Sequence, residues 1–119
     1  RGGTRGPNYS PEDIAAACGN LAKSGVLERV MVDCSHANSR KDYTKQVEVA
    51  QSLAQQVASG DKRILGVMIE SHLHAGRQDL KPGVPLQPGI SITDGCIGWE
   101  QTETVLRELA QAAKARRRA

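Results

Sequence analysis

Two short apolar segments, each leading into a polar loop and then a helical pattern, constrain the fold of this chain most strongly. Residues 29–34 (RVMVDC) and 64–69 (ILGVMI) are dominated by aliphatic and β-branched side chains. Such runs, without strict alternation of apolar and polar positions, are typical of strands buried in a parallel sheet. Because helical patterns alternate with these strands, the sequence predicts βα units and an α/β fold.

Helix signals flank both predicted strands. Ser10, followed by Pro and two acidic residues, predicts a helix start, and Gly25 predicts its end. Ser39 and Asp42 form a pair that resembles a capping box, so we expect a second helix to start there and to end at Gly60.

A long segment without periodicity, residues 71–93, separates the second strand from the last helical pattern. It contains repeated Gly and Pro residues, and loops this long in a compact domain are usually functional or disordered. Asp94 is the expected cap of the amphipathic helix that follows. Neither strand is followed by a Gly-x-Gly-x-x-Gly motif, so a dinucleotide site has no support.

Charge, hydrophobicity and cysteine usage exclude several classes of function. The net charge is only +3, and no aromatic residues interleave with the basic cluster at the end of the chain, which suits a solvated helix terminus better than a nucleic-acid site. No apolar run approaches the roughly 20 residues that a membrane span needs. Three widely spaced cysteines are typical of a reduced cytosolic protein. We expect a cytoplasmic protein that binds neither nucleic acid nor membranes.

Two buried strands cannot close a barrel or cover their own apolar faces. A chain of 119 residues with this pattern would expose apolar surface, so it should need missing barrel segments or copies of itself. We therefore expect a homo-oligomer or an association with a missing N-terminal segment. The chain opens on Arg1-Gly2-Gly3 rather than Met, which favours a fragment or a processed chain.

Polar residues with metal-binding chemistry follow both strands. His36 and Glu70 occupy equivalent positions one βα repeat apart, and Asp94 precedes the last helix. In a parallel barrel all three would lie on the C-terminal rim, where one imidazole and two carboxylates suit a divalent metal. The alternative is a set of polar rim residues without a metal. His72 and His74 alternate with Glu70 and form a rival set, although isolated loop histidines more often hydrogen-bond or meet solvent.

Three local sequences resemble the closing motifs of the type I 3-deoxy-D-arabino-heptulosonate-7-phosphate (DAHP) synthases. They are DCSHANS at 33–39, GVMIESHL at 66–73 and SITDGCIGW at 91–99. The opening Arg-Gly-Gly, the PNYS segment at 7–10 and the basic tail fit the same family. The resemblance covers essentially the whole chain, in order.

The resemblance implies a (β/α)8 TIM barrel in which residues 1–119 form the C-terminal portion, the last two βα units, of a single barrel domain whose N-terminal part is absent. The family's enzymes condense phosphoenolpyruvate with erythrose 4-phosphate and release phosphate, which is the first step of the shikimate pathway. Their divalent metal, which could be manganese, iron, cobalt or zinc, is held by Cys, His, Glu and Asp ligands. The last three would be His36, Glu70 and Asp94. The Cys ligand belongs to an absent strand, and Cys34 and Cys96 are expected to be buried and inert.

The resemblance also implies individual roles. Arg1 matches an arginine that binds the phosphate of phosphoenolpyruvate, a task that suits a permanently charged, bidentate guanidinium. His36 would be catalytic and contact phosphoenolpyruvate, and Asp94 would contribute to substrate binding. Gly95 departs from the Ala that is more usual in the family, which should loosen the start of the last helix.

Two alternatives remain open. One is a related phosphoenolpyruvate-dependent aldolase, such as 3-deoxy-octulosonate-8-phosphate synthase. The other is a non-catalytic barrel fragment that self-associates. The isolated 119-residue chain is expected to have no synthase activity.

Overall fold

The chain is an α/β structure, as predicted. A computed structural model describes all 119 residues, and its elements follow in the order α1 (Pro11–Lys23), β1 (Val30–Asp33), η1 (Tyr43–Lys45), α2 (Gln46–Ala58), β2 (Ile64–Met68) and α3 (Trp99–Arg118). Both strands lie within the apolar runs that predicted them. None of the helices combines the length and the apolar character needed to cross a bilayer.

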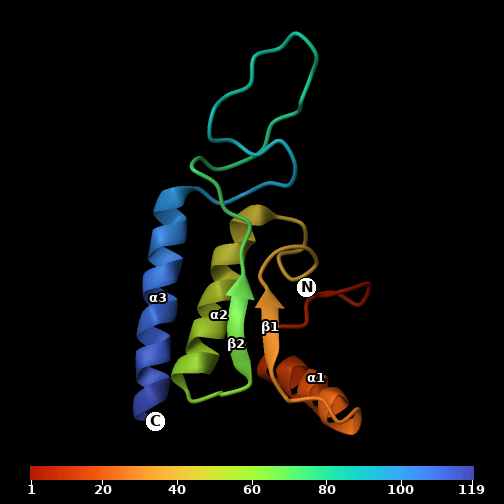
Figure 1. The fold of residues 1–119 in the computed structure, drawn as a ribbon, viewed down its shortest axis with the longest axis vertical. Helices are drawn as coiled ribbons and strands as arrows, with labels where there is room; N and C mark the ends of the chain where they lie inside the picture. Colours follow the sequence, from red (N-terminus) through yellow and green to blue (C-terminus); the bar gives the residue numbers. More distant parts are fainter.

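The two strands form a parallel sheet (Figure 1). Val30 pairs with Ile64, and Asp33 pairs with Met68 at the other end of the ladder. Because parallel strands end at the same edge, the loops that follow β1 and β2 leave the sheet side by side. The chain segments that carry His36 and Glu70 are therefore neighbours in space.

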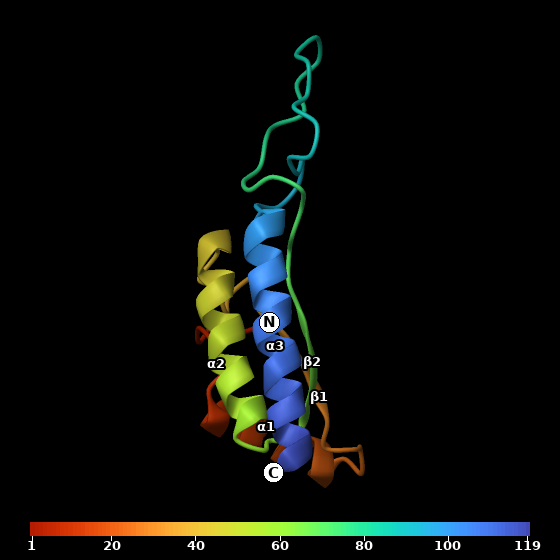
Figure 2. The same ribbon diagram turned by 90° about the vertical axis from the view of Figure 1, so that its left-hand side faces the viewer.

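Helices α2 and α3 cover one face of this sheet (Figure 2). Val32 and Ile64 point from the strands into a core that also contains Leu53 of α2 and Val105 of α3, and all four are at most 5% exposed. The core therefore lies between the sheet and its helices, where amphipathic helices bury their apolar stripes.

The opposite face of the sheet is open. Met31 and Leu65 alternate with the buried strand positions and are 68% and 65% exposed. The expectation that this chain alone leaves apolar strand surface uncovered is confirmed for these side chains.

The first helix begins as predicted. The Ser10 hydroxyl accepts a hydrogen bond from the Asp13 amide at 3.1 Å, and the Asp13 carboxylate accepts from the Ser10 amide at 3.3 Å. This reciprocal pair is a capping box. The helix ends at Lys23, and Gly25 then adopts a φ of +70°.

The predicted start of the second helix is wrong by several residues. Asp42 caps the short η1 instead, by accepting from the Thr44 amide at 3.0 Å, and α2 begins only at Gln46. The Ser39 hydroxyl donates to the carbonyl of His36 at 3.3 Å rather than capping a helix. Side chains that hydrogen-bond to a nearby turn are not available to cap a helix, and here Ser39 and Asp42 bond within the turn that precedes α2.

The predicted cap of the last helix is also wrong. Helix α3 begins at Trp99, and its N-cap is Gly98, which makes no side-chain hydrogen bond. Asp94 and Gly95 belong to a loop that is tied to the preceding long segment through a bridge between Gly76 and Cys96. Asp94 is thereby free to face the end of the sheet, and Gly95 cannot loosen a helix start.

The long segment between β2 and α3 is a loop, as predicted. It extends well beyond the sheet and helices (Figure 1) and contains only isolated bridges. Gln78 organises it internally: its amide group donates to the carbonyls of Gln87 and Ile90 at 2.8 and 2.9 Å.

Candidate metal centre

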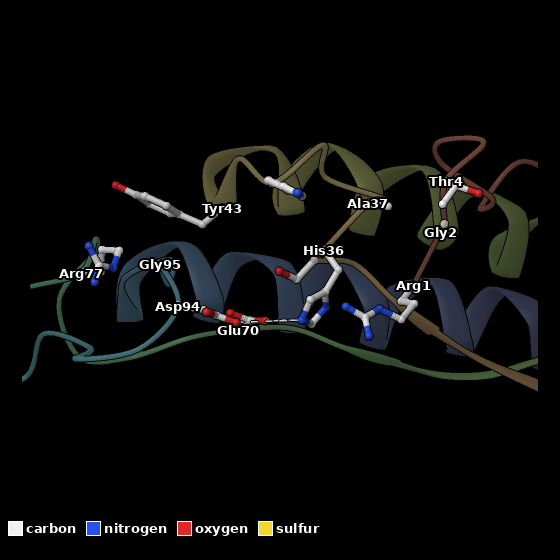
Figure 3. A pocket seen from close by; sticks show the side chains of 13 residues that line it. Arg1, Gly2, Thr4, His36, Ala37, Tyr43, Glu70, Arg77, Asp94 and Gly95 are labelled. Carbon is white, nitrogen blue, oxygen red and sulfur yellow. Dashed lines mark ion pairs between the residues drawn. The ribbon is translucent and has the colours of Figure 1, made fainter. Parts of the chain in front are cut away.

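Three side chains from three separate segments converge at the carboxyl end of the sheet. His36 follows β1, Glu70 follows β2, and Asp94 precedes α3 (Figure 3). The Nε2 atom of His36 lies 3.3 Å from a carboxylate oxygen of Glu70 and 3.9 Å from one of Asp94. One ligand atom from each of the three residues lies within 4.8 Å of the others. The structure thus brings together the three residues that were predicted to share the C-terminal rim of a parallel barrel.

The chemistry of this cluster fits a divalent cation. Two ligand atoms that each lie about 2.1 Å from one ion are at most about 4.2 Å apart, and the two measured His36 distances fall below that limit. Two carboxylates near one imidazole nitrogen also concentrate negative charge that a cation would neutralise. One nitrogen and two oxygen donors suit zinc, iron, cobalt or manganese.

The His36 ring is oriented by Asp33, the last residue of β1. The Nδ1 atom of His36 lies 2.7 Å from the Asp33 carboxylate, which can only accept, so Nδ1 donates. In the neutral ring this leaves the lone pair of Nε2 facing Glu70 and Asp94. The other oxygen of Asp33 accepts from the amide of Ser35 at 2.7 Å, which fixes the carboxylate in turn.

The backbone around His36 is strained in a way that serves this orientation. His36 has a φ of +55°, in the left-handed region that non-glycine residues seldom adopt. Asn38 supports the turn, because its side-chain amide donates to the Asp33 carbonyl at 2.8 Å. Strain of this kind persists only where surrounding contacts hold it, and it clusters at functional sites.

The Asp94 loop packs against the aromatic ring of Tyr43. A Cβ at Gly95 would lie 2.5 Å from the Cδ1 atom of Tyr43, closer than side-chain atoms approach one another. Gly95 therefore gives the Tyr43 ring room beside Asp94. The physical consequence of Gly95 is a close aromatic contact, not the looser helix predicted from sequence.

Arg1 lies on the same side of the molecule as the cluster. It lines an open cavity of about 690 Å³ together with His36, Glu70 and Asp94, and its guanidinium lies beside the His36 ring in Figure 3. Its main chain is held by Asn38, whose amide donates to the Arg1 carbonyl at 3.1 Å. The cavity is therefore lined by a guanidinium cation as well as by the three candidate ligands.

The remaining predicted residues contribute no ligand atom to the cluster. His72 and His74 are exposed and do not join His36, Glu70 and Asp94, so the rival set is not assembled. Cys34 and Cys96 are buried free thiols, as expected. Burial, reinforced by the neighbouring Asp33 charge, raises the pKa of Cys34 to about 12, and burial also raises the pKa of Cys96. Such thiols are poor nucleophiles and poor ligands.

Three supporting residues were missed from sequence. Asp33 had a usable signal, because a carboxylate three positions before a strand-end histidine is well placed to bond its ring. Asn38 and Gln46 had none, since the bonds that tie them to Asn8 and Glu70 join segments far apart along the chain. Asn38 accepts from the Asn8 amide at 2.7 Å, and Gln46 bonds the main chain of Glu70.

Comparison with known proteins shows which family the chain resembles. Residues 1–107 match the family model described as the DAHP synthetase I family. A phospho-2-dehydro-3-deoxyheptonate aldolase of Haemophilus influenzae is 54% identical over 119 residues, which is all of this chain and 33% of the relative. The Phe-sensitive enzyme of that name from Escherichia coli K12 is 53% identical over 117 residues, covering 98% of this chain and 33% of its own length.

A solved structure agrees with these relatives. The phospho-2-dehydro-3-deoxyheptonate aldolase of Francisella tularensis superposes with a TM-score of 0.92 at 43% identity, covering 98% of this chain and 33% of that one. The chain thus spans about a third of the length of the relatives it matches. With matching sequence over nine-tenths of its length and the same local fold, the chain belongs to the DAHP synthetase I family.

Proposed function

We propose that this chain is the C-terminal segment of a metal-dependent DAHP synthase, in which it supplies three metal ligands and one substrate-binding arginine. The observation that carries the proposal is the convergence of His36, Glu70 and Asp94 within 4.8 Å at the carboxyl end of a parallel sheet. Family membership supports the reaction: condensation of phosphoenolpyruvate with erythrose 4-phosphate and release of phosphate.

The barrel would be completed by chain outside these residues. The exposed Met31 and Leu65 side chains face away from the helices, where further strands of a (β/α)8 barrel would cover them. A cysteine from one of those strands would be the fourth ligand, because the Cys34 and Cys96 thiols are buried and neither contributes a ligand atom to the cluster. We propose a homo-oligomer of the complete barrel, and the three free thiols favour a cytoplasmic location.

When bound, the divalent metal would act as a Lewis acid on the aldehyde of erythrose 4-phosphate or position a nucleophilic water. Arg1 would hold the phosphate of phosphoenolpyruvate through a bidentate, charge-assisted contact. Asp33 keeps a proton on Nδ1 of His36, so that Nε2 stays available at the reacting end of the ring. Asp94, which lines the cavity and has a side chain 72% exposed to solvent, is placed to contact substrate as well as metal.

The covalent steps need no acyl or phosphoryl intermediate on this chain. The C2=C3 double bond of phosphoenolpyruvate opens as C3 forms a bond to the aldehyde carbon of erythrose 4-phosphate, and the aldehyde oxygen takes up a proton. Water adds at C2 and loses a proton. The C2–O bond to phosphate then breaks as the new C2 hydroxyl loses its proton, which leaves the ketone and inorganic phosphate. The residues of this chain contribute orientation and charge to these steps.

The test uses a polypeptide in which this chain is joined to the remainder of the barrel. Product formation from phosphoenolpyruvate and erythrose 4-phosphate should disappear with EDTA and return with Mn²⁺. His36→Ala and Glu70→Ala should each abolish both turnover and Mn²⁺ binding. Metal binding that survives both substitutions would overturn the proposed centre, and faster turnover of arabinose 5-phosphate would favour the related octulosonate synthase.

The 119-residue chain alone should not turn over these substrates, because two strands form only part of the barrel rim. The same assay with Mn²⁺ and both substrates tests this. Turnover by the isolated chain would show that the missing strands are dispensable.

A further inference from the structure

A buried glutamine that is not itself a candidate ligand binds the main chain of one of the ligands. Gln46, the first residue of α2, has no solvent-exposed surface, although glutamine is normally a surface residue. A fully buried amide must find partners for both its donor and its acceptor. The place where Gln46 finds them is the main chain of Glu70.

The contact is a two-point pairing. The Glu70 amide donates to Oε1 of Gln46 at 2.8 Å, and Nε2 of Gln46 donates to the Glu70 carbonyl at 3.0 Å. The Gln46 side chain thus pairs with both main-chain groups of one residue, as a neighbouring strand would. Because β2 ends at Met68, the ladder between β1 and β2 does not reach Glu70.

The Gln46 side-chain amide also contacts the segment that carries Tyr43. Nε2 of Gln46 donates to the Tyr43 carbonyl at 3.2 Å, and the Tyr43 ring packs against Gly95 beside Asp94. The Glu70 carbonyl accepts a second bond, from the Ile97 amide at 3.1 Å, in the loop that carries Asp94. The placements of Glu70 and of the Asp94 loop therefore share one anchor on helix α2.

We infer that Gln46 is a positioning residue for the metal centre, which sets the location of the Glu70 carboxylate by clamping the Glu70 backbone. The inference rests on the proposed function, because Glu70 must be a ligand for its position to matter. Groups behind a ligand typically change metal affinity by about 10- to 100-fold when they are removed. A main-chain clamp acts in the same way, since a shifted Cα moves the carboxylate with it.

Gln46→Met tests the clamp while preserving the volume of the side chain. In the complete barrel protein, Mn²⁺ titrated as the chloride should bind with a Kd about 10- to 100-fold higher than in the parent. Turnover lost at limiting Mn²⁺ should return at saturating Mn²⁺, with the KM for phosphoenolpyruvate unchanged, because Arg1 lies on a different segment. Gln46→Asn keeps an amide that is too short to reach both groups of Glu70, and it should weaken Mn²⁺ binding in the same direction.

Gln56→Met is the matched control. Gln56 also lies in α2 and also makes a long-range bond to the main chain, from Nε2 to the Tyr9 carbonyl at 2.8 Å, but it lies away from the centre. Its loss should lower the melting temperature without changing the Kd for Mn²⁺. A purely structural role for Gln46 predicts the same pattern for Gln46→Met, and that result would overturn the inference.

Glu70→Ala tests the metal centre separately from the positioning role of Gln46. If Glu70→Ala weakens Mn²⁺ binding while Gln46→Met and Gln46→Asn do not, the positioning role is wrong and the metal centre stands. If Glu70→Ala binds Mn²⁺ as the parent does, the metal centre itself is wrong, and the role of Gln46 falls with it.

Discussion

Replacing Gly2 by alanine should displace Arg1 from the cavity that it lines with His36, Glu70 and Asp94. Gly2 has a φ of +73°, and a Cβ built there would lie 2.8 Å from the Cβ of Ala37, 2.9 Å from the Gly6 carbonyl oxygen and 3.0 Å from the Asn38 amide nitrogen. Two of these three atoms are main chain and cannot rotate away. The Arg1 segment must therefore move from the turn that carries His36.

The cost has two parts. The left-handed conformation costs about 1–2 kcal/mol for a residue with a Cβ. Overpacking against fixed neighbours costs about 1–3 kcal/mol more. Gly6→Ala measures the backbone cost without the packing cost, because Gly6 has a positive φ of +105° but nothing lies within 4 Å of a Cβ built there. The packing part alone then predicts an affinity for phosphoenolpyruvate roughly 5- to 150-fold weaker in Gly2→Ala than in Gly6→Ala.

The assay is equilibrium binding of phosphoenolpyruvate to the complete barrel protein, measured by calorimetry for the parent, Gly2→Ala and Gly6→Ala. Melting temperatures measured in parallel check that each variant is folded. Equal affinities for the two variants would refute the reasoning, since they would mean that the close contacts of Gly2 do not position Arg1. Parent-like affinity in Gly2→Ala would refute the role of Arg1 in phosphate binding as well.

Four further predictions concern Asp33, Arg1 and Cys34. Asp33→Asn removes the charge behind the His36 ring and should weaken Mn²⁺ binding by about tenfold in a titration. Arg1→Lys keeps the charge but loses the bidentate fork, so the KM for phosphoenolpyruvate should rise while the Kd for Mn²⁺ stays constant. Cys34, with its pKa raised from 9.0 to about 12, should resist iodoacetamide in the folded protein at pH 8. Below pH 9 the thiol is neutral in both the folded and the unfolded chain, so its contribution to the free energy of unfolding is fully present. As the pH rises from 9 toward 12 only the unfolded chain ionises it, so the free energy of unfolding should fall by about 1.4 kcal/mol per pH unit. Alkaline denaturation curves would measure this fall.

Features set by neighbouring residues were predictable from sequence. The two strands lie within their apolar runs, and Ser10 and Asp13 form the first cap across three positions. His36 and Glu70 were predicted to meet because parallel strands must end at one edge, whatever else the chain does. Local chemistry and strand direction were sufficient for these features.

Helix starts were less predictable, because the same side chains had other uses. Asp42 caps a short turn of helix before α2, and Asp94 faces the end of the sheet instead of capping α3. Both aspartates could accept a hydrogen bond as an N-cap. Tertiary contacts decide which amide or cation each carboxylate binds. The predictions made from sequence for these two helix starts were therefore wrong.

The sequence by itself determined an α/β chain with a histidine and a carboxylate at the ends of two parallel strands, because side-chain periodicity and strand chemistry are local properties. Only the tertiary structure decided how these groups are held. Asn38 reaches back to Asn8 and the Arg1 carbonyl, and Gln46 reaches forward to Glu70. Such bonds join segments that lie far apart in the chain and become neighbours only once the core has packed, so no local pattern encodes them.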